Sequence, residues 1–255
     1  MTKVRVLLAG ETWTSTTFHV KGFDLFSSSD RQSGLGPLLR ALDGSDIDIV
    51  HLPGERVPGD FPSTREEFDA YDVIVLSDVG ANSILLHPDT FLRGQRTPNR
   101  LAALADWVRD GGGYMMIGGY LTFQGINGSG RYKGTPAEAI LPVDMLAHDD
   151  RIEVPEGFHP HVISPGHPTI AGIEGDWPYL LGLNEVTVAD GGEVILTTGS
   201  AAGNHPLLVA GTHGKGRTLA WMSDIGPHWL PTAFSDWDGY ARLWTQSFRW
   251  LSGRV

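Results

Sequence analysis

The sequence of 255 residues contains no cysteine, and this absence excludes three kinds of chemistry at once. Without thiols the chain can form no disulfide bond, no thiolate metal site and no cysteine nucleophile. It also lacks any apolar run near the ~18 residues that a membrane-spanning helix requires, so we expect no membrane partner. The N-terminus runs directly into a short apolar segment without the features of a signal peptide, which favours a cytoplasmic protein.

Positive charge is scarce as well. Lys and Arg number 19 against 30 Asp and Glu, which gives a net charge of -11, and no basic run interrupts this balance. Proteins that bind nucleic acid usually carry a basic surface, so we expect no nucleic-acid partner. The hydrophobic content of 41% allows a large core, and we predict one α/β domain over residues 1–255.

Short apolar runs alternate with helical patterns in the first half of the chain. The strands are expected at residues 4–9, 47–52, 73–76 and 114–117. Helices are expected at 34–42, at 63–68 behind a capping box over residues 63–66, and from Pro98 to about residue 110 with Thr97 as the cap. This order predicts a flavodoxin-like, doubly wound and mostly parallel sheet with helices on both faces.

The C-terminal part adds an antiparallel hairpin and one long helix. The hairpin is expected over residues 206–222, around a Gly-rich turn. The helix carries a single apolar face, made of Trp237, Tyr240, Ala241, Trp244, Phe248 and Leu251. Such spacing is more typical of core packing than of a cofactor site.

Polar residues follow the predicted strands at the point where each strand ends. The carboxyl ends of parallel strands meet at one edge of a sheet, so we expect these residues to line one cleft for a small-molecule ligand. The predicted ligand-binding residues are Glu11, Trp13, His19, Lys21, Ser77, Asp78, Gly119, Tyr120, Asp224, His228 and Trp229. Candidates for catalysis among them are Glu11, His19, Asp78, Tyr120, Asp224 and His228.

The same residues could supply nitrogen and oxygen ligands to a metal. They show no close metal-binding motif such as His-Glu-x-x-His, however, and the histidines can equally be hydrogen-bonded core residues. No Gly-x-Ser-x-Gly elbow for a serine nucleophile is present, and the Gly-rich segments do not match a phosphate loop. We therefore assign no metal site and no cofactor.

The segment Gly111–Phe123, which reads GGGYMMIGGYLTF, resembles a bacterial group called glutamine amidotransferase-like proteins. Further matches are found along nearly the full chain, at Gly10–Trp13, His19–Asp24, Tyr71–Asn82, Gly134–Pro136, Leu141–Val143 and Ser223-Asp224 with Trp229. The resemblance implies the class I amidotransferase fold and the position of its cleft. The resemblance says little about activity, because the group is defined by similarity to amidotransferases rather than by an activity of its own.

In class I amidotransferases the strand that corresponds to residues 114–117 ends in a turn bearing the catalytic cysteine. A His-Glu pair follows a late strand. Here the turn reads Gly118-Gly119-Tyr120 and the late strand ends in Ser223-Asp224, so the resemblance carries over the fold but not the catalytic residues. Glutamine hydrolysis needs an activated thiolate, and we expect no glutaminase activity.

Three functions stay open at this point. The first is an amidotransferase-like protein that binds a small polar metabolite at the strand-end cleft. The second is a hydrolase or lyase that uses histidine and carboxylates, with or without a metal, on a sugar-like or amide substrate; a carboxylate paired to His19 or His228 would favour it. The third is a non-catalytic homo-oligomeric module, with an interface over residues 81–96 if its apolar side chains are exposed.

Overall fold

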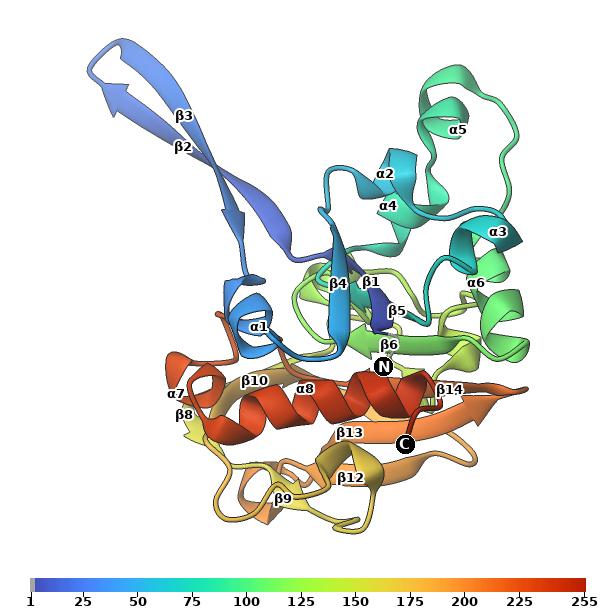
Figure 1. The fold of residues 1–255 in the computed structure, drawn as a ribbon. Coiled ribbons are helices and arrows are strands. Elements are labelled where there is room, and N and C mark those ends of the chain that lie inside the picture. Colours follow the sequence, from blue (N-terminus) through green and yellow to red (C-terminus); the bar gives the residue numbers. More distant parts are fainter. Residues whose placement is uncertain (1–2) are drawn as a thin grey trace.

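A computed structural model describes residues 3–255, and its centre is one eight-stranded sheet (Figure 1). The order of its strands is β4 (Ile47–Leu52), β1 (Val4–Gly10), β5 (Val73–Ser77), β6 (Gly113–Ile117), β14 (Gly216–Trp221), β13 (Pro206–His213), β12 (Glu193–Thr197) and β9 (His161–Val162). The first five strands are parallel, and the last three continue the sheet in antiparallel pairs. The predicted α/β fold and its C-terminal hairpin are confirmed.

Helices cover both faces of this sheet. At Gly113 and Gly216 a helix backbone occupies the space that a side chain would need. A Cβ on Gly113 would lie 2.7 Å from Leu251 O, and one on Gly216 would lie 2.1 Å from Val108 O. These glycines lie one register position apart on paired strands, so they point to opposite faces. Hence α8 (Asp238–Leu251) and α6 (Arg100–Arg109) pack on opposite sides of the sheet.

The aromatic face of α8 is buried, as predicted. Tyr240, Trp244 and Phe248 are fully buried, and the Trp244 ring packs edge-on against Trp221 of β14. The face therefore anchors the C-terminal helix to the sheet through apolar contact. The remaining helices are α1 (Gly36–Ala41), α2 (Val57–Asp60), α3 (Arg65–Phe68), α4 (Ala81–Leu85), α5 (Pro88–Arg93) and α7 (Thr232–Ser235), with short 3₁₀ turns at Ile126–Gly128, Glu138–Ile140, Pro168–Ile170 and Ser200–Ala202.

Two of the predicted helix caps were wrong by one or two residues. The capping box at α3 pairs Thr64 with Glu67, whose carboxylate accepts from Thr64 N at 3.0 Å. Helix α6 begins after Asn99, whose Oδ1 accepts from two backbone N–H groups of the first turn. Thr97 instead shares a hydrogen bond with Thr90. Asn is a strong N-cap, and here it displaces the Thr-Pro start.

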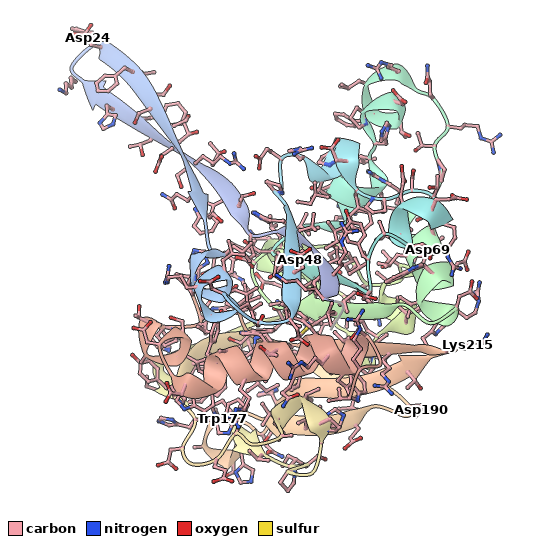
Figure 2. All side chains as sticks on the ribbon, in the orientation of Figure 1. Asp24, Asp48, Asp69, Trp177, Asp190 and Lys215 are labelled. Atoms are coloured by element: carbon pink, nitrogen blue, oxygen red, sulfur yellow. The ribbon has the colours of Figure 1, made fainter. Side chains whose placement is uncertain are left out.

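A long β-hairpin interrupts the expected passage from the first strand to the first helix. Strands β2 (Thr12–Lys21) and β3 (Asp24–Ser33) pair in register and project from the body as an arm, with Asp24 at its far end (Figures 1 and 2). Two small antiparallel pairs complete the structure: β8 (Arg151–Phe158) with β10 (Leu180–Asn184), and β7 (Val143–Met145) with β11 (Val186–Val188). Within residues 3–255, none of the helices combines the length and the hydropathy that a membrane span requires.

Candidate functional site

The carboxyl ends of four central strands lie level with one another. In the sheet register Gly10 pairs with Ser77, Ser77 with Ile117, and Ile117 with Trp221. The residues that follow these positions therefore emerge at one edge of the sheet. This register brings together the segments that carry Glu11, Asp78, Gly119 and Asp224.

Glu11 is a buried carboxyl group at this edge. The Ser77 hydroxyl donates a hydrogen bond of 2.5 Å to Glu11 Oε1, and the other oxygen lies where a side chain on Gly34 would sit. Burial, and secondarily the nearby carboxylates of Asp224 and Asp78, raise the pKa of Glu11 well above its usual range. Glu11 therefore favours its neutral form, which can donate a proton.

The side chains of Asp78 and Asp224 both approach the turn at Gly119. A Cβ on Gly119 would be 3.1 Å from Asp78 Oδ1 and 3.4 Å from Asp224 Oδ1, and the φ of +145° suits only glycine. Asp78 Oδ1 accepts from Leu121 N at 2.8 Å, and burial raises the pKa of Asp78. At the turn where the amidotransferase nucleophile is expected, two carboxylates thus occupy the space of a side chain.

Asp224 is paired with His228, which follows it by four residues. Asp224 Oδ2 lies 3.6 Å from His228 Nδ1 and accepts from Trp229 N at 3.3 Å. Burial raises the pKa of Asp224 to about 6 in spite of these partners, and Asp224 in turn raises the pKa of His228. The His228 ring is 47% exposed, so this pair joins a buried carboxylate to solvent.

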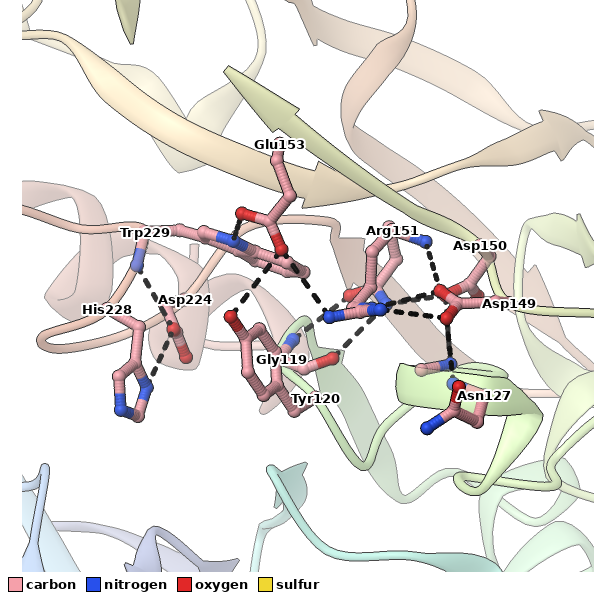
Figure 3. A network of polar contacts seen from close by, with 12 residues as sticks. Gly119, Tyr120, Asn127, Asp149, Asp150, Arg151, Glu153, Asp224, His228 and Trp229 are labelled. Atoms are coloured by element: carbon pink, nitrogen blue, oxygen red, sulfur yellow. Dashed lines mark hydrogen bonds and ion pairs between the residues drawn. The ribbon is translucent and has the colours of Figure 1, made fainter. Parts of the chain in front are cut away.

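Aromatic rings surround His228. Tyr120 stacks on it with ring centroids 5.7 Å apart, and Trp13 lies at 5.2 Å. Trp229 packs edge-on against Tyr120 and donates from Nε1 to Glu153 Oε2 at 2.9 Å (Figure 3). The imidazole therefore contacts two aromatic rings as well as the carboxylate of Asp224.

A second polar network holds the backbone of the turn at Gly119, and its residues were not predicted from the sequence. Asn184 Oδ1 accepts from Gly119 N at 3.0 Å, while Asn184 Nδ2 donates to Gly119 O and to Asp150 Oδ1. Arg151 pairs with Asp149 and lies over the Tyr120 ring at 5.1 Å (Figure 3). These residues lie 30 to 65 positions from Gly119 in the chain, at the paired ends of β8 and β10 and just before β8, and no local motif signals their role.

The structure brings most of the predicted binding residues together: Glu11, Trp13, Ser77, Asp78, Gly119, Tyr120, Asp224, His228 and Trp229. His19 and Lys21 do not lie at this edge, which corrects the prediction that they line the same cleft. Both lie on the arm, where His19 stacks on Phe26 and Lys21 lies over the same ring. Residues 12–33, for which no element was predicted, form a hairpin that pairs over ten positions per strand.

Among residues 3–255, no three His, Asp or Glu side chains are arranged as a metal-ion ligand set. A cavity of about 1020 Å³ lies between β8 and the turn at Ser200–Ala202, and it is not lined by Glu11, Asp78 or Asp224. Its wall includes Glu153, which also accepts from Trp229. Glu153 therefore lies between this cavity and the aromatic residues around His228.

Comparison with known proteins identifies the family. The family model described as "Putative glutamine amidotransferase" (GATase1-like) matches residues 5–253. The cytoplasmic protein STM3548 from Salmonella typhimurium is 40% identical, with a TM-score of 0.91 over 96% of this chain and 98% of that chain. The cytoplasmic protein STM1381 from Salmonella typhimurium LT2 is 38% identical, with a TM-score of 0.91 over 97% and 99%.

A ThuA-like protein from Parabacteroides merdae shares only 13% identity, with a TM-score of 0.56 over 99% of this chain and 91% of that chain, which shows the fold alone. No curated protein matches the chain. The family model covers residues 5–253, and the chain has no cysteine, so the turn Gly118-Gly119-Tyr120 carries no thiol. The chain therefore belongs to the GATase1-like family, as a glutamine amidotransferase-like protein that lacks the thiol nucleophile.

Proposed function

We propose that the chain binds a small polar metabolite bearing amine, amide or hydroxyl groups at the strand-end site. The observation that carries the proposal is a cluster of three carboxyl groups. Glu11 and Asp224 are buried and Asp78 is partly buried; Asp78 and Asp224 approach Gly119, and both also act on the pKa of Glu11. Among residues 3–255 none of the three is paired with a Lys or Arg side chain. A ligand that supplies hydrogen-bond donors or positive charge would complete this site.

The aromatic rings support the same ligand class. Trp13 and Tyr120 pack around His228, and an ammonium group or the apolar face of a sugar binds well against such rings. An anionic ligand would meet the carboxylates of Asp78 and Asp224 and is disfavoured. The two Salmonella relatives are named as cytoplasmic proteins, which supports a cytoplasmic location as part of this proposal.

A thermal-shift screen with matched ligands tests the proposal. We expect amines, amides and sugars to raise the melting temperature, because a ligand at 100 times its Kd stabilises the fold by about 2.7 kcal/mol. Carboxylic acids of the same size should have no effect. The variant Asp78→Asn should weaken binding at least tenfold, whereas Asp190→Asn, on the exposed turn after β11, should not. Equal binding of acids and amines would refute the proposed specificity.

The Asp224–His228 pair favours a second candidate function, a hydrolase or lyase that uses acid-base catalysis. A histidine oriented by a buried carboxylate is a common general base, and here His228 Nδ1 faces Asp224 at 3.6 Å. The neutral Glu11 would be the acid at the same edge. The pair could then move a proton between solvent and a bound substrate.

The pH dependence of turnover tests this second function. The base form of His228 is present only above its raised pKa, so activity on amide or glycosidic substrates should increase as pH rises through that pKa, above the usual 6.5. The substitution His228→Gln should reduce turnover by a factor of about 10² or more, in line with the usual contribution of a general base. Binding of a substrate analogue should change far less. Turnover that survives His228→Gln would exclude this role.

A further inference from the structure

We propose that the chain forms a two-fold symmetric dimer in which the arm of each copy inserts its tip into an apolar groove of the other. We define the arm as residues 12–33, the β2–β3 hairpin, and the groove as the hollow beside α4 and α5. The proposal does not depend on the ligand-binding function.

The arm has no support from its own chain beyond its base. Its base is held by hydrogen bonds of Thr12 to Gly54 and Glu55 and by the ion pair of Arg31 with Glu55. Within the described part of the chain, the hydrogen bonds and ring contacts of residues 14–30 are all made to other residues of the hairpin. A two-stranded hairpin is marginally stable alone in water, so an arm of this length points to a missing contact.

One face of the arm changes from polar to apolar toward the tip. Side chains two apart on a strand share a face, so Thr14 and Thr16 near the base lie on the same face as Phe18 and Val20. Val20 is paired across the hairpin with Leu25, and Phe23 at the turn is fully exposed. The polar base suits water, whereas the apolar tip suits burial against a partner.

The groove offers a matching apolar surface. It has a volume of about 380 Å³, and its walls include Pro58, Leu86, Pro88, Phe91 and Leu92. Phe91 and Leu92 are 70% and 72% exposed. By contrast Ile84, in the same predicted interface segment, is fully buried as core. The exposed large hydrophobic side chains of residues 81–96, which are Leu86, Phe91 and Leu92, therefore all line the groove.

The positions of the two features select a second copy of the chain as the occupant. The arm and the α4–α5 projection extend from the same side of the body and diverge from each other (Figure 1). A two-fold axis between them would place each arm on the groove of the other copy, which closes the assembly. The two reciprocal contacts also double the buried area, toward the ~1,600 Å² of a standard stable interface.

Sedimentation velocity and introduced cysteines test the dimer. We expect the unmodified protein to be a dimer, and expect Phe23→Ser and Leu92→Asp each to raise the dimer dissociation constant at least tenfold. Both side chains are exposed, so neither change should affect folding, and Ile163→Ser provides a control at an exposed apolar residue elsewhere. A monomeric wild-type protein at high concentration, or a dimer unaffected by Leu92→Asp, would overturn the proposal.

Because the chain has no cysteine, Phe23→Cys and Leu92→Cys each introduce a unique thiol. A short bismaleimide should cross-link a mixture of the two variants after subunit exchange, and should cross-link neither variant alone to the same extent. Efficient cross-linking of Phe23→Cys alone would show that the arms pair with each other, and would overturn the assignment of the groove.

Discussion

The variant Asp224→Asn is expected to be more stable than the wild type by about 1–3 kcal/mol at about pH 8, and to lose ligand binding. Burial raises the pKa of Asp224 from 3.8 to about 6, so at neutral pH the fold must keep an unfavourable charge. Asparagine fits the same space and can still accept from Trp229 N without that charge. A stability gain with a loss of function is the usual sign of a strained site.

The sign of the pH dependence follows from the raised pKa. The neutral carboxyl group is compatible with the fold, so its favourable contribution is complete below the unfolded pKa near 3.8 and is lost as pH rises through about 6. The advantage of Asp224→Asn should therefore vanish at about pH 4 and reach its full value above about pH 7.

Urea unfolding at several pH values measures this difference, with Asp190→Asn as the exposed control. The control should track the wild type within about 0.5 kcal/mol at every pH. If Asp224→Asn is destabilised at about pH 8, the contacts of Asp224 with His228 and with Trp229 N outweigh the burial of its charge, and the assignment of an unfavourable charge is wrong.

The variant Arg100→Met is expected to cost about 3–5 kcal/mol of unfolding free energy. Arg100 is buried at the start of α6, and its guanidinium donates to backbone carbonyl groups of two other helices. It bonds Ile84 O at 2.6 Å and Ser83 O in the last turn of α4, and Val57, Pro58 and Phe61 carbonyls around α2. Helix C-termini leave such carbonyls without partners, so methionine would bury several of them unsatisfied.

Loss of Arg100 should also loosen the groove, since Pro58 and Ser83 contribute both to its wall and to the contacts of Arg100. Amide hydrogen exchange should accelerate at residues 57–61 and 83–86 before the rest of the fold opens. Arg109→Met in the same helix is the matched control: its exposed pair with Asp106 contributes at most about 1 kcal/mol. Equal effects of both substitutions would show that Arg100 does not hold these helices.

Local patterns predicted the fold well. Apolar runs of strand length predicted all five parallel strands, with β14 predicted as the second strand of the hairpin. The spacing of Tyr240, Trp244 and Phe248 predicted the buried face of α8. These signals are reliable because burial imposes a period on each element separately. Two helix caps were misplaced because several polar residues compete for one cap position, and only backbone geometry selects among them.

The candidate site was predictable where it follows the strand ends. Glu11, Asp78 and Asp224 each come directly after a strand or within a few residues of it, so the parallel register alone brings them together. His19 and Lys21 could not be placed in this way. Their segment is rich in Thr and Ser and lacks the apolar alternation of a half-buried strand, because the arm packs against no core.

The sequence by itself determined that this chain has no thiol chemistry, because it contains no cysteine and the turn that carries the catalytic cysteine in class I amidotransferases reads Gly118-Gly119-Tyr120. Only the tertiary structure decided how the remaining polar groups behave. The raised pKa of Glu11 depends on burial and on Asp78 and Asp224, which are 67 and 213 residues away in the chain. Such shifts come from distances and from the exclusion of water, which exist only in the folded protein.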